Sequence, residues 1–464
     1  MKAREGIFVV FVLTIVSMNA FARPLDLKIY STKNFLLGKA TTGCMPKGMK
    51  IDPVGDSLYV AEMCGKFDPK TKKIQPSASI FDVPGRTLVK TLRTPLGMRK
   101  GGIFANTEIE FSLDELWGFI TRAEGDSGSE IYKNTGLLTV INTESQKIAK
   151  YIPLHSSGAK IISVRPYLKE DIRRSQIIYV ANYFSDDISI VDVTDLRENE
   201  NLDGTAHFKG LIELHTSFKN PNSHGYFIAP RGIAFTPDGR YALILATETG
   251  SLIILDSVTH RQIAEIAPID KRSAGRELNV RHVVISKDGQ TAYFSHMRGN
   301  AISRISIPRL MATIKNLKKT GPEVTLPSTL WDELFIPFQT AVGPQKILVL
   351  EDYPLDHPNF PGLKWNLAHP NTIVLDPLKN RYLFVSHRTT SDKDINKVDP
   401  KIMGKIDIID VVKDRVVFSL VGGAQPTALE ISHDGRLLMS AGLINDTLYF
   451  FDLKKILGVY ELGE

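Results

Sequence analysis

The chain has 464 residues, of which 57 are Lys or Arg and 51 are Asp or Glu, so its formal net charge is +6 at pH 7. With 43% hydrophobic residues it can bury one large core or two smaller ones. Because the basic residues form no long run, the sequence does not indicate a dedicated nucleic-acid domain, although an anionic partner stays open.

The first 22 residues have the composition of a secretory signal peptide. Lys2 and Arg4 precede an apolar run at 7–16, and Ala20-Phe21-Ala22 offers small residues for cleavage. No later segment reaches the roughly 20 apolar residues that a membrane span needs. We therefore expect cleavage near Ala22, a mature chain of residues 23–464 without a transmembrane segment, and a periplasmic or secreted location.

The two cysteines, Cys44 and Cys64, flank a pair of strand-like runs that meet at a Pro-Val-Gly-Asp turn, residues 53–56. A hairpin centred on this turn places Ile51 opposite Ser57 and Cys44 opposite Cys64. Cross-strand neighbours are close enough for a disulfide, and an oxidising compartment favours its formation. We predict a Cys44–Cys64 disulfide, with two free thiols as the alternative.

The clearest pattern is a unit of four short strands at residues 230–266. Two strand-like runs at 232–236 and 241–246 are joined by a Pro-Asp-Gly turn, and two more follow at 252–256 and 262–266. Asp-Gly turns favour tight hairpins. The unit is therefore expected to be a four-stranded antiparallel meander.

Imperfect copies of this unit recur along the chain. Together with the clearest one, they begin at or near Pro46, Asn106, Ala159, Pro230, Val280, His369 and Gln425. One such sheet cannot cover both of its faces, so the repeats predict an all-β, seven-bladed β-propeller with radially packed blades. The last copy has three clear strands, and the strand-like sequence at 27–40 is expected to pair with it and close the ring.

Residues 178–193, IYVANYFSDDISIVDV, consist of a Tyr-Val-Ala-Asn strand, a short turn and a second strand. This stretch resembles the YVTN repeat, and the chain is similar to the YVTN-repeat proteins, seven-bladed β-propellers of prokaryotic envelopes and surfaces. The third and fourth repeats are closest to the pattern. The resemblance implies the fold but no activity, because propellers serve both as binding proteins and as enzymes.

Residues 320–365 interrupt the repeat between the fifth and sixth units. The segment is rich in proline and aromatic residues and lacks the strand pattern. Long insertions often form lids or contact surfaces. We expect this one to shape access to the channel of the propeller, with an inert surface excursion as the alternative.

One face of the ring is expected to collect the residues of a site. In a propeller, the loop that enters each first strand and the loop between the second and third strands lie on the same face. Equivalent entering positions in four units hold Lys47, Lys160, Arg231 and Arg281. These cations predict a channel mouth that attracts anions. The alternative is that each cation pairs with a nearby carboxylate such as Glu62 or Glu248.

Four histidines from adjacent units are expected on the same face: His282, His296, His369 and His387. Imidazoles are common metal ligands, but the sequence has no HExxH spacing, and Arg298 and Arg388 would repel a cation. We therefore predict no cofactor, with a metal site as the weaker alternative. Asn371 completes the predicted ligand-binding set.

These patterns favour an exported, monomeric binding or scaffolding protein. Its partner would be an anionic small molecule, an envelope polymer or a protein, held at the channel mouth. One alternative is a lactonase-like or metal-dependent hydrolase that uses His282, His296 or His387. Another is a redox partner similar to the propeller subunits of quinoprotein amine dehydrogenases. No catalytic residue is identified, and an enzyme is the less favoured interpretation.

Overall fold

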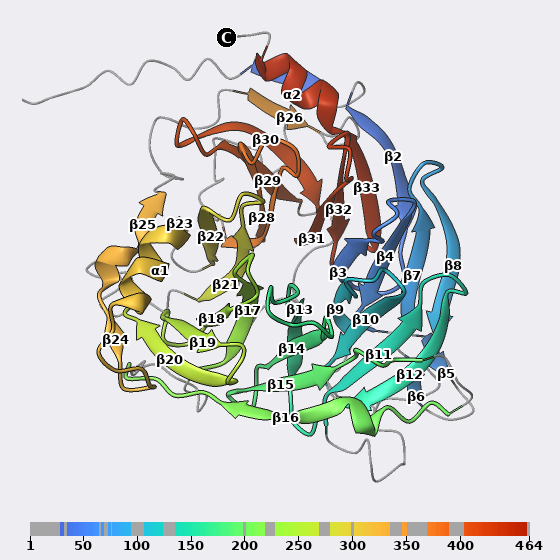
Figure 1. The fold of residues 1–464 in the computed structure, drawn as a ribbon. Coiled ribbons are helices and arrows are strands. Elements are labelled where there is room, and N and C mark those ends of the chain that lie inside the picture. Colours follow the sequence, from blue (N-terminus) through green and yellow to red (C-terminus); the bar gives the residue numbers. More distant parts are fainter. Residues whose placement is uncertain are drawn as a thin grey trace, which may run out of the picture.

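The computed structural model is a closed ring of seven β-sheets around a central axis (Figure 1). It describes residues 28–31, 35–64, 66–68, 73–75, 77–93, 106–123, 135–197, 201–218, 228–268, 279–297, 301–334, 346–349, 369–388 and 403–461. The predicted seven-bladed propeller of four-stranded antiparallel blades is confirmed. The predicted signal peptide, residues 1–22, and Arg298 lie outside the described residues.

The first strand of each blade lies nearest the axis, and the next two follow outwards. The inner strands are β3 (Pro46–Ile51), β9 (Asn106–Phe111), β13 (Ala159–Val164), β17 (Pro230–Phe235), β21 (Val280–Ile285), β27 (His369–Leu375) and β31 (Pro426–Ile431). The second strands are β4 (Ser57–Glu62), β10 (Trp117–Arg122), β14 (Ile177–Asn182), β18 (Tyr241–Ala246), β22 (Thr291–His296), β28 (Tyr382–Arg388) and β32 (Leu437–Gly442). The third strands are β7 (Ser77–Asp82), β11 (Leu137–Asn142), β15 (Asp187–Asp192), β19 (Leu252–Asp256), β23 (Ala301–Ser306), β29 (Gly404–Asp410) and β33 (Thr447–Asp452).

The fourth strand of each blade lies on the outer rim. In blade order these strands are β8 (Thr87–Arg93), β12 (Lys147–Pro153), β16 (Phe208–Glu213), β20 (Arg261–Ile266), β25 (Asp332–Leu334), β30 (Arg415–Gly423) and β2 (Leu36–Thr41). The remaining elements are β1 (Lys28–Ser31), β5 (Lys66–Asp68), β6 (Lys73–Gln75), β24 (Thr325–Leu326), β26 (Lys346–Val349), η3 (Thr205–His207), η4 (Ser328–Leu330), α1 (Ile307–Lys315) and α2 (Leu453–Glu461). Among the described residues, no helix has the length and apolar character needed to cross a lipid bilayer.

An apolar cluster fills each interface between neighbouring blades. Blades 3 and 4, for example, share a cluster that includes Tyr179 and Ile244, and corresponding clusters occupy the other six interfaces. Burial of this surface is what holds the blades together, because the hydrophobic effect scales with the apolar area removed from water.

The hairpin between the first and second strands repeats one hydrogen-bond pattern. In blade 4, the Thr236 hydroxyl donates to Asp238 at 2.6 Å and accepts from the amide of Tyr241 at 3.0 Å. The glycine that follows Asp238 has a φ of 70°, which glycine adopts at little cost. Ser286 and Ser432 make the same two bonds in blades 5 and 7. These bonds explain why the Asp-Gly motif recurs along the sequence.

Two contacts between distant parts of the chain close the ring. On the outside, β2 pairs antiparallel with β33, with Leu36 opposite Phe451 and Thr41 opposite Thr447. On the inside, the Thr427 hydroxyl donates to the carbonyl oxygen of Pro46 at 3.1 Å. The predicted closure by an N-terminal strand is confirmed for β2, whereas residues 28–31 of the same predicted segment form β1, which pairs with β26 in the sheet of blade 6.

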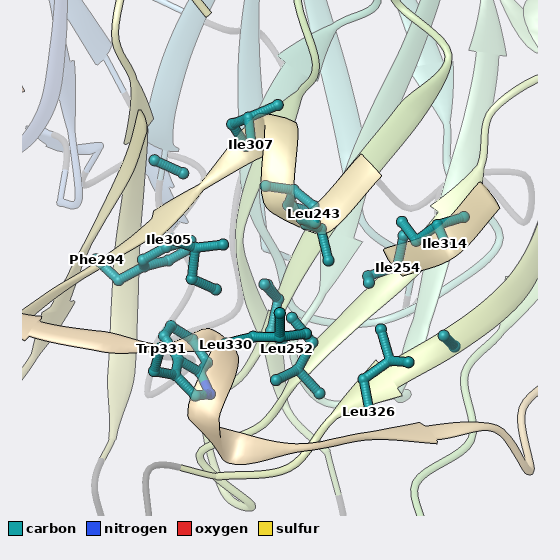
Figure 2. Close-up of a cluster of buried hydrophobic side chains, with 14 of the residues drawn as sticks. Leu243, Leu252, Ile254, Phe294, Ile305, Ile307, Ile314, Leu326, Leu330 and Trp331 are labelled. Atoms are coloured by element: carbon teal, nitrogen blue, oxygen red, sulfur yellow. The ribbon is translucent and has the colours of Figure 1, made fainter. Parts of the chain in front are cut away.

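The described part of the segment 320–365 lies along the outer rim (Figure 1). Here β24 pairs with β20, β25 supplies the fourth strand of blade 5, and β26 pairs with β30 and with β1. Leu326, Leu330 and Trp331 pack with α1 against the apolar cluster between blades 4 and 5 (Figure 2). The described residues of the segment complete and cover the rim. None of them supports the expected role in shaping access to the channel, which stays a prediction.

Candidate functional site

Every inner strand is interrupted by a β-bulge close to its first residue. In blade 4, Pro230 pairs with Ala246 and Ile233 with Ile244, so that Arg231 and Gly232 together oppose one residue. Equivalent shifts of register occur in the other six inner strands. A bulge bends its strand and turns the side chain of the extra residue. We call this end of the channel, where first strands begin and second strands end, the mouth.

The bulges hold the four cations that the sequence singled out. Blades 1, 3, 4 and 5 contribute Lys47, Lys160, Arg231 and Arg281, and the corresponding residues of blades 2, 6 and 7 are Thr107, Asn371 and Thr427. Glycine permits close approach of neighbouring inner strands at this level, since a Cβ on Gly232 would lie 2.8 Å from the carbonyl oxygen of Arg281. The backbones that carry the cations are therefore packed tightly around the axis.

Hydroxyl groups fix the bulges to the neighbouring blades. In blade 2, the amide of Glu108 donates to the Thr121 hydroxyl at 3.1 Å, and that hydroxyl is 2.6 Å from the carbonyl oxygen of Lys160. Ser295 makes the same two contacts in blade 5, at 3.1 and 2.7 Å. A bulge leaves an amide outside the strand ladder, and a buried amide needs an acceptor. These hydroxyls satisfy the amides and make the mouth rigid.

Positive charges from three other blades act on Lys47. Its side chain is buried, and its pKa lies well below 10.5, first because of burial and then because of Arg231, Arg388 and Arg281. Glu108 opposes this shift. Since these residues come from blades 1, 2, 4, 5 and 6, their charges face one shared space. A low dielectric strengthens such a field, so the mouth has a positive potential.

Glu108 and His282 follow the first bulge position in blades 2 and 5. Burial raises the pKa of Glu108 to about 7, although Lys47, Arg231 and Lys160 lower it in part. Burial, followed by three of the mouth cations, holds the pKa of His282 well below 6.5. At pH 7 the mouth therefore combines a neutral imidazole with a carboxyl group that is close to its titration point.

Two arginines at the mouth are held by amide side chains. Arg281 is fully buried, and its guanidinium donates to Asn279 at 2.5 Å and to Asn371 at 3.3 Å. Arg388 is also buried and donates to Gln425 at 3.3 Å. Amide side chains orient a guanidinium through their oxygen and carry no charge themselves.

Lys160 has aromatic neighbours. Its ammonium group lies 5.7 Å from the ring centroids of both Tyr183 and Phe184, in the range of a cation–π interaction. The two rings form an edge-on pair with centroids 5.4 Å apart. Blade 3 thus presents a cation and two rings side by side at the mouth.

The other three histidines each have a different contact, although His369 is near enough to His387 to contribute to the lowering of its pKa. His296 is buried and contacts the Ser303 hydroxyl at 2.6 Å, and burial lowers its pKa to about 4. His387 lies 3.0 Å from Asp407, and His369 contacts the carbonyl oxygen of Met297 at 3.1 Å. Within the described ranges, no group of three or more His, Cys, Asp or Glu side chains is arranged to hold a metal ion.

The contacts of His296 and His387 belong to the repeat. Glu62 and Asn182 occupy equivalent positions on the second strands of blades 1 and 3 and bond to serines of the third strands, as His296 does. In blade 6 the third-strand partner is Asp407, which also contacts Lys405 at 2.9 Å. These polar pairs join the second strand to the third, which is a structural role that the sequence did not reveal.

The predicted disulfide between Cys44 and Cys64 is present. It joins the residues just before β3 and just after β4, and the amide of Cys64 donates to the carbonyl oxygen of Cys44 at 3.3 Å. The bond therefore ties the two mouth loops of blade 1 together, three residues from Lys47.

The predicted register of this hairpin is wrong by one residue. Ile51 pairs with Leu58 and not with Ser57, because Asp52 and Ser57 close a four-residue turn. The bulge at Lys47 then shifts the pairing by one residue and brings the two cysteines opposite each other. The longer turn and the bulge shift the register in opposite directions, so the predicted pairing of the cysteines holds although the register near the turn does not.

The opposite end of the channel, which we call the far end, has a different set of charges. Lys50 lies 3.7 Å from Glu110, and Glu110 and Glu430 together raise the pKa of this lysine. Burial raises the pKa of Glu430 to about 7, and Lys50 opposes that shift. Here one cation stands between two carboxyl groups.

The fold places the chain in the class of seven-bladed β-propellers. It is similar to the β-propeller domain of Cps50 (Swd1) from Myceliophteria thermophila, with 12% identity and a TM-score of 0.57 over 90% of this chain and 99% of that one. A chain of a mitotic checkpoint complex has 10% identity and a TM-score of 0.53, over 97% and 96% of the two chains. A putative 6-phosphogluconolactonase from Bacteroides uniformis has 12% identity and a TM-score of 0.49, over 86% and 92%.

At identities this low, the similarity shows the fold alone. No protein-family model and no curated protein matches the sequence. Membership of the YVTN-repeat proteins therefore stays a prediction, supported by residues 178–193.

Proposed function

We propose that the protein is an exported propeller that binds an anionic ligand at the mouth of its channel. The observation that carries this proposal is the mutual proximity of the mouth cations: the charged groups that act on Lys47 are three guanidinium groups and one carboxylate. The fold holds these like charges together against their repulsion. An anion that enters the mouth relieves this repulsion and adds its own hydrogen bonds.

The chemistry of the cations favours an oxyanion with more than one negative charge. Guanidinium groups present a planar fork of donors that matches carboxylate, sulfate and phosphate oxygens. Arg231, Arg281 and Arg388 supply three such forks from blades 4, 5 and 6. A bound anion also favours the protonated form of Lys47, because it offsets the share of the pKa lowering that the neighbouring cations add to the effect of burial.

The disulfide supports the proposed location outside the cytoplasm. Disulfides form and persist in oxidising compartments and are rare in reducing ones. Together with the predicted signal peptide, the Cys44–Cys64 bond favours a periplasmic or secreted protein. We propose that the mature protein works there as a monomer.

Binding of inorganic sulfate, followed by calorimetry in a chloride-free buffer, tests the proposal. Arg231→Gln removes one mouth cation and should weaken sulfate binding about tenfold. The matched control is Arg240→Gln in the same blade, because Arg240 contacts Glu170 and Asp256 on the opposite face and lies in the turn between β17 and β18. The control should bind sulfate like the wild type.

A second variant, Lys160→Met, guards against misfolding of the first, since Lys160 is only partly buried. Equal affinity in the wild type and both mouth variants, or no sulfate binding by the wild type, would contradict the proposal. Dextran sulfate in the same assay separates the two sources of the ligand. Much tighter binding of the polymer than of sulfate identifies an envelope polymer, and similar affinity per site identifies a small anion.

A protein partner with an acidic segment would meet the same cations, and one similar chain is part of a mitotic checkpoint complex. The hydrolase and redox-partner alternatives stay predictions. Turnover of lactones or esters would favour the first, and co-purification with an electron-transfer chain would favour the second.

A further inference from the structure

We propose that Glu108 is a built-in counter-ion of the mouth, which competes with an incoming anion for the same cations and so makes anion binding weaker as the pH rises. The inference rests on the proposed anion-binding function. It assigns to Glu108 a role in setting affinity, whereas the cations provide the attraction.

The position of the Glu108 side chain supports this role. Glu108 belongs to the bulge of β9, and its amide is fixed by the Thr121 hydroxyl at 3.1 Å. Its carboxylate reaches across to the inner strand of blade 1, where a Cβ on Gly48 would lie 2.5 Å from the Glu108 Oε2 atom. Because residue 48 is glycine, the carboxylate can lie directly over this strand, next to the residue that follows Lys47.

Cations from three elements surround this carboxylate. They are Lys47 on β3, Lys160 on β13 and Arg231 on β17. Lys50, further along β3, also interacts with Glu108, and a carboxylate of its own strand, Glu110, repels it. Lys47, Lys160 and Arg231 are three of the four bulge cations to which a ligand would bind. The side chain of Glu108 and a bound anion therefore compete for the same positive charges.

Protonation of Glu108 removes the competitor. Its pKa is raised to about 7, first by burial, and the surrounding cations reverse this only in part. Below this pH the carboxyl group is neutral and the mouth has one more net positive charge; above it, the ionised carboxylate repels anions. Anion binding and protonation of Glu108 therefore favour each other, and binding takes up a proton.

Two other mouth groups must be separated from Glu108. The pKa of His282 lies well below 6.5, so this imidazole stays neutral throughout the relevant range. Lys47 has a lowered pKa, and loss of its proton would also weaken anion binding as the pH rises. Lys47→Arg keeps a positive charge at every pH used and isolates the contribution of Glu108.

The test is sulfate binding by calorimetry from about pH 6 to about pH 8.5, a range in which sulfate keeps its charge. For the wild type we expect the affinity to fall about tenfold across this range, and for Glu108→Gln to stay constant and to exceed the wild type about tenfold at the upper end. Lys47→Arg should retain the slope. Glu144→Gln, an exposed change on the opposite face, controls for net charge and should behave like the wild type.

The outcomes distinguish this inference from the proposed function. Sulfate binding that is equally strong and equally pH-dependent in the wild type and in Glu108→Gln would overturn the inference and leave the anion site standing. A slope abolished by Lys47→Arg and kept by Glu108→Gln would also overturn it. Absence of binding in both proteins would overturn both proposals. Should Glu108→Gln fail to fold, proton uptake on sulfate binding by Lys47→Arg at about pH 7, measured in buffers of different ionisation enthalpy, supports the inference, and its absence refutes it.

Discussion

The mouth and the far end of the channel are built from the same seven inner strands and differ in their charges. At the mouth, cations from several blades act on one another, with Glu108 between them. At the far end, Lys50 is balanced by Glu110 and Glu430. The bulges occur only at the mouth end of these strands in the described registers. An extra residue outside the ladder can vary without cost to strand pairing, which leaves the mouth free to specialise.

The largest expected effect is a loss of stability when a buried charge near the mouth is removed. It is compared with the removal of a partly exposed charge at the far end. Burial opposes ionisation of Asp407, but Lys405 and His387 outweigh it and lower its pKa. Asp407→Asn removes the charge that both partners contact, so we expect the free energy of unfolding to fall by about 3–4 kcal/mol. Denaturant titration at pH 7 measures this.

The matched far-end variant is Glu110→Gln. Its ion pair with Lys50 is 37% exposed on the lysine side and spans 3.7 Å. A partly exposed pair of this kind contributes less than about 1 kcal/mol. If Glu110→Gln lowered the free energy of unfolding as much as Asp407→Asn, the charges at the two ends would contribute equally to stability.

The disulfide provides the next largest effect and sharpens the comparison, because it ties the mouth loops and does not touch the far end. The bond closes a loop with a sequence separation of 20 residues. The double variant Cys44→Ser/Cys64→Ser should lower the free energy of unfolding by about 3 kcal/mol through the entropy of the unfolded chain. Reductant should destabilise the wild type to the same level and leave the double variant unchanged. If reductant also destabilised the double variant, the loss of stability in the wild type would have a cause other than the Cys44–Cys64 bond.

An effect smaller than those of Asp407→Asn and of the disulfide is expected at the far end, and it depends on pH. The pKa of Glu430 rises from 4.5 to about 7 in the folded protein, so its contribution to stability is present below pH 4.5 and is lost as the pH rises to 7. Glu430→Gln does not suffer this loss. We expect it to be more stable than the wild type by about 1–2 kcal/mol at about pH 8 and equal to it at about pH 4. A difference that stays constant with pH would count against the assignment.

The periodic features of the molecule were predictable from the sequence. Strand and turn residues recur in each unit, so the seven blades, the closing strand and the equivalent positions of Lys47, Lys160, Arg231 and Arg281 could be found by alignment of the repeats. The disulfide followed from its place at the ends of one hairpin. Each of these features depends on local pattern or on position within the repeat.

The remaining features depend on contacts that carry no pattern of their own. Strand β25 has three residues and lies beyond α1, so it was hidden in the segment 320–365. Asp407 could have been noticed as a charged residue inside a buried strand, GKIDIID, but its partner His387 comes from another strand. The proposed competition of Glu108 with a ligand depends on the glycine at position 48 across the blade boundary, a contact that the repeat pattern does not indicate.

The closure of the ring constrains the order of folding. The amide of Met45 donates to the side chain of Asp446, 401 residues later. Strand β2 likewise cannot pair until β33 has been synthesised. During synthesis from the N-terminus, the apolar residues of blade 1 that face blade 7, such as Val60 and Phe81, have no neighbour until the end of the chain has been made. Completion of the ring is therefore the last folding step, and its high contact order makes it slow. A cut that removes either closing strand leaves an unpaired sheet edge, the kind of surface through which β-proteins aggregate.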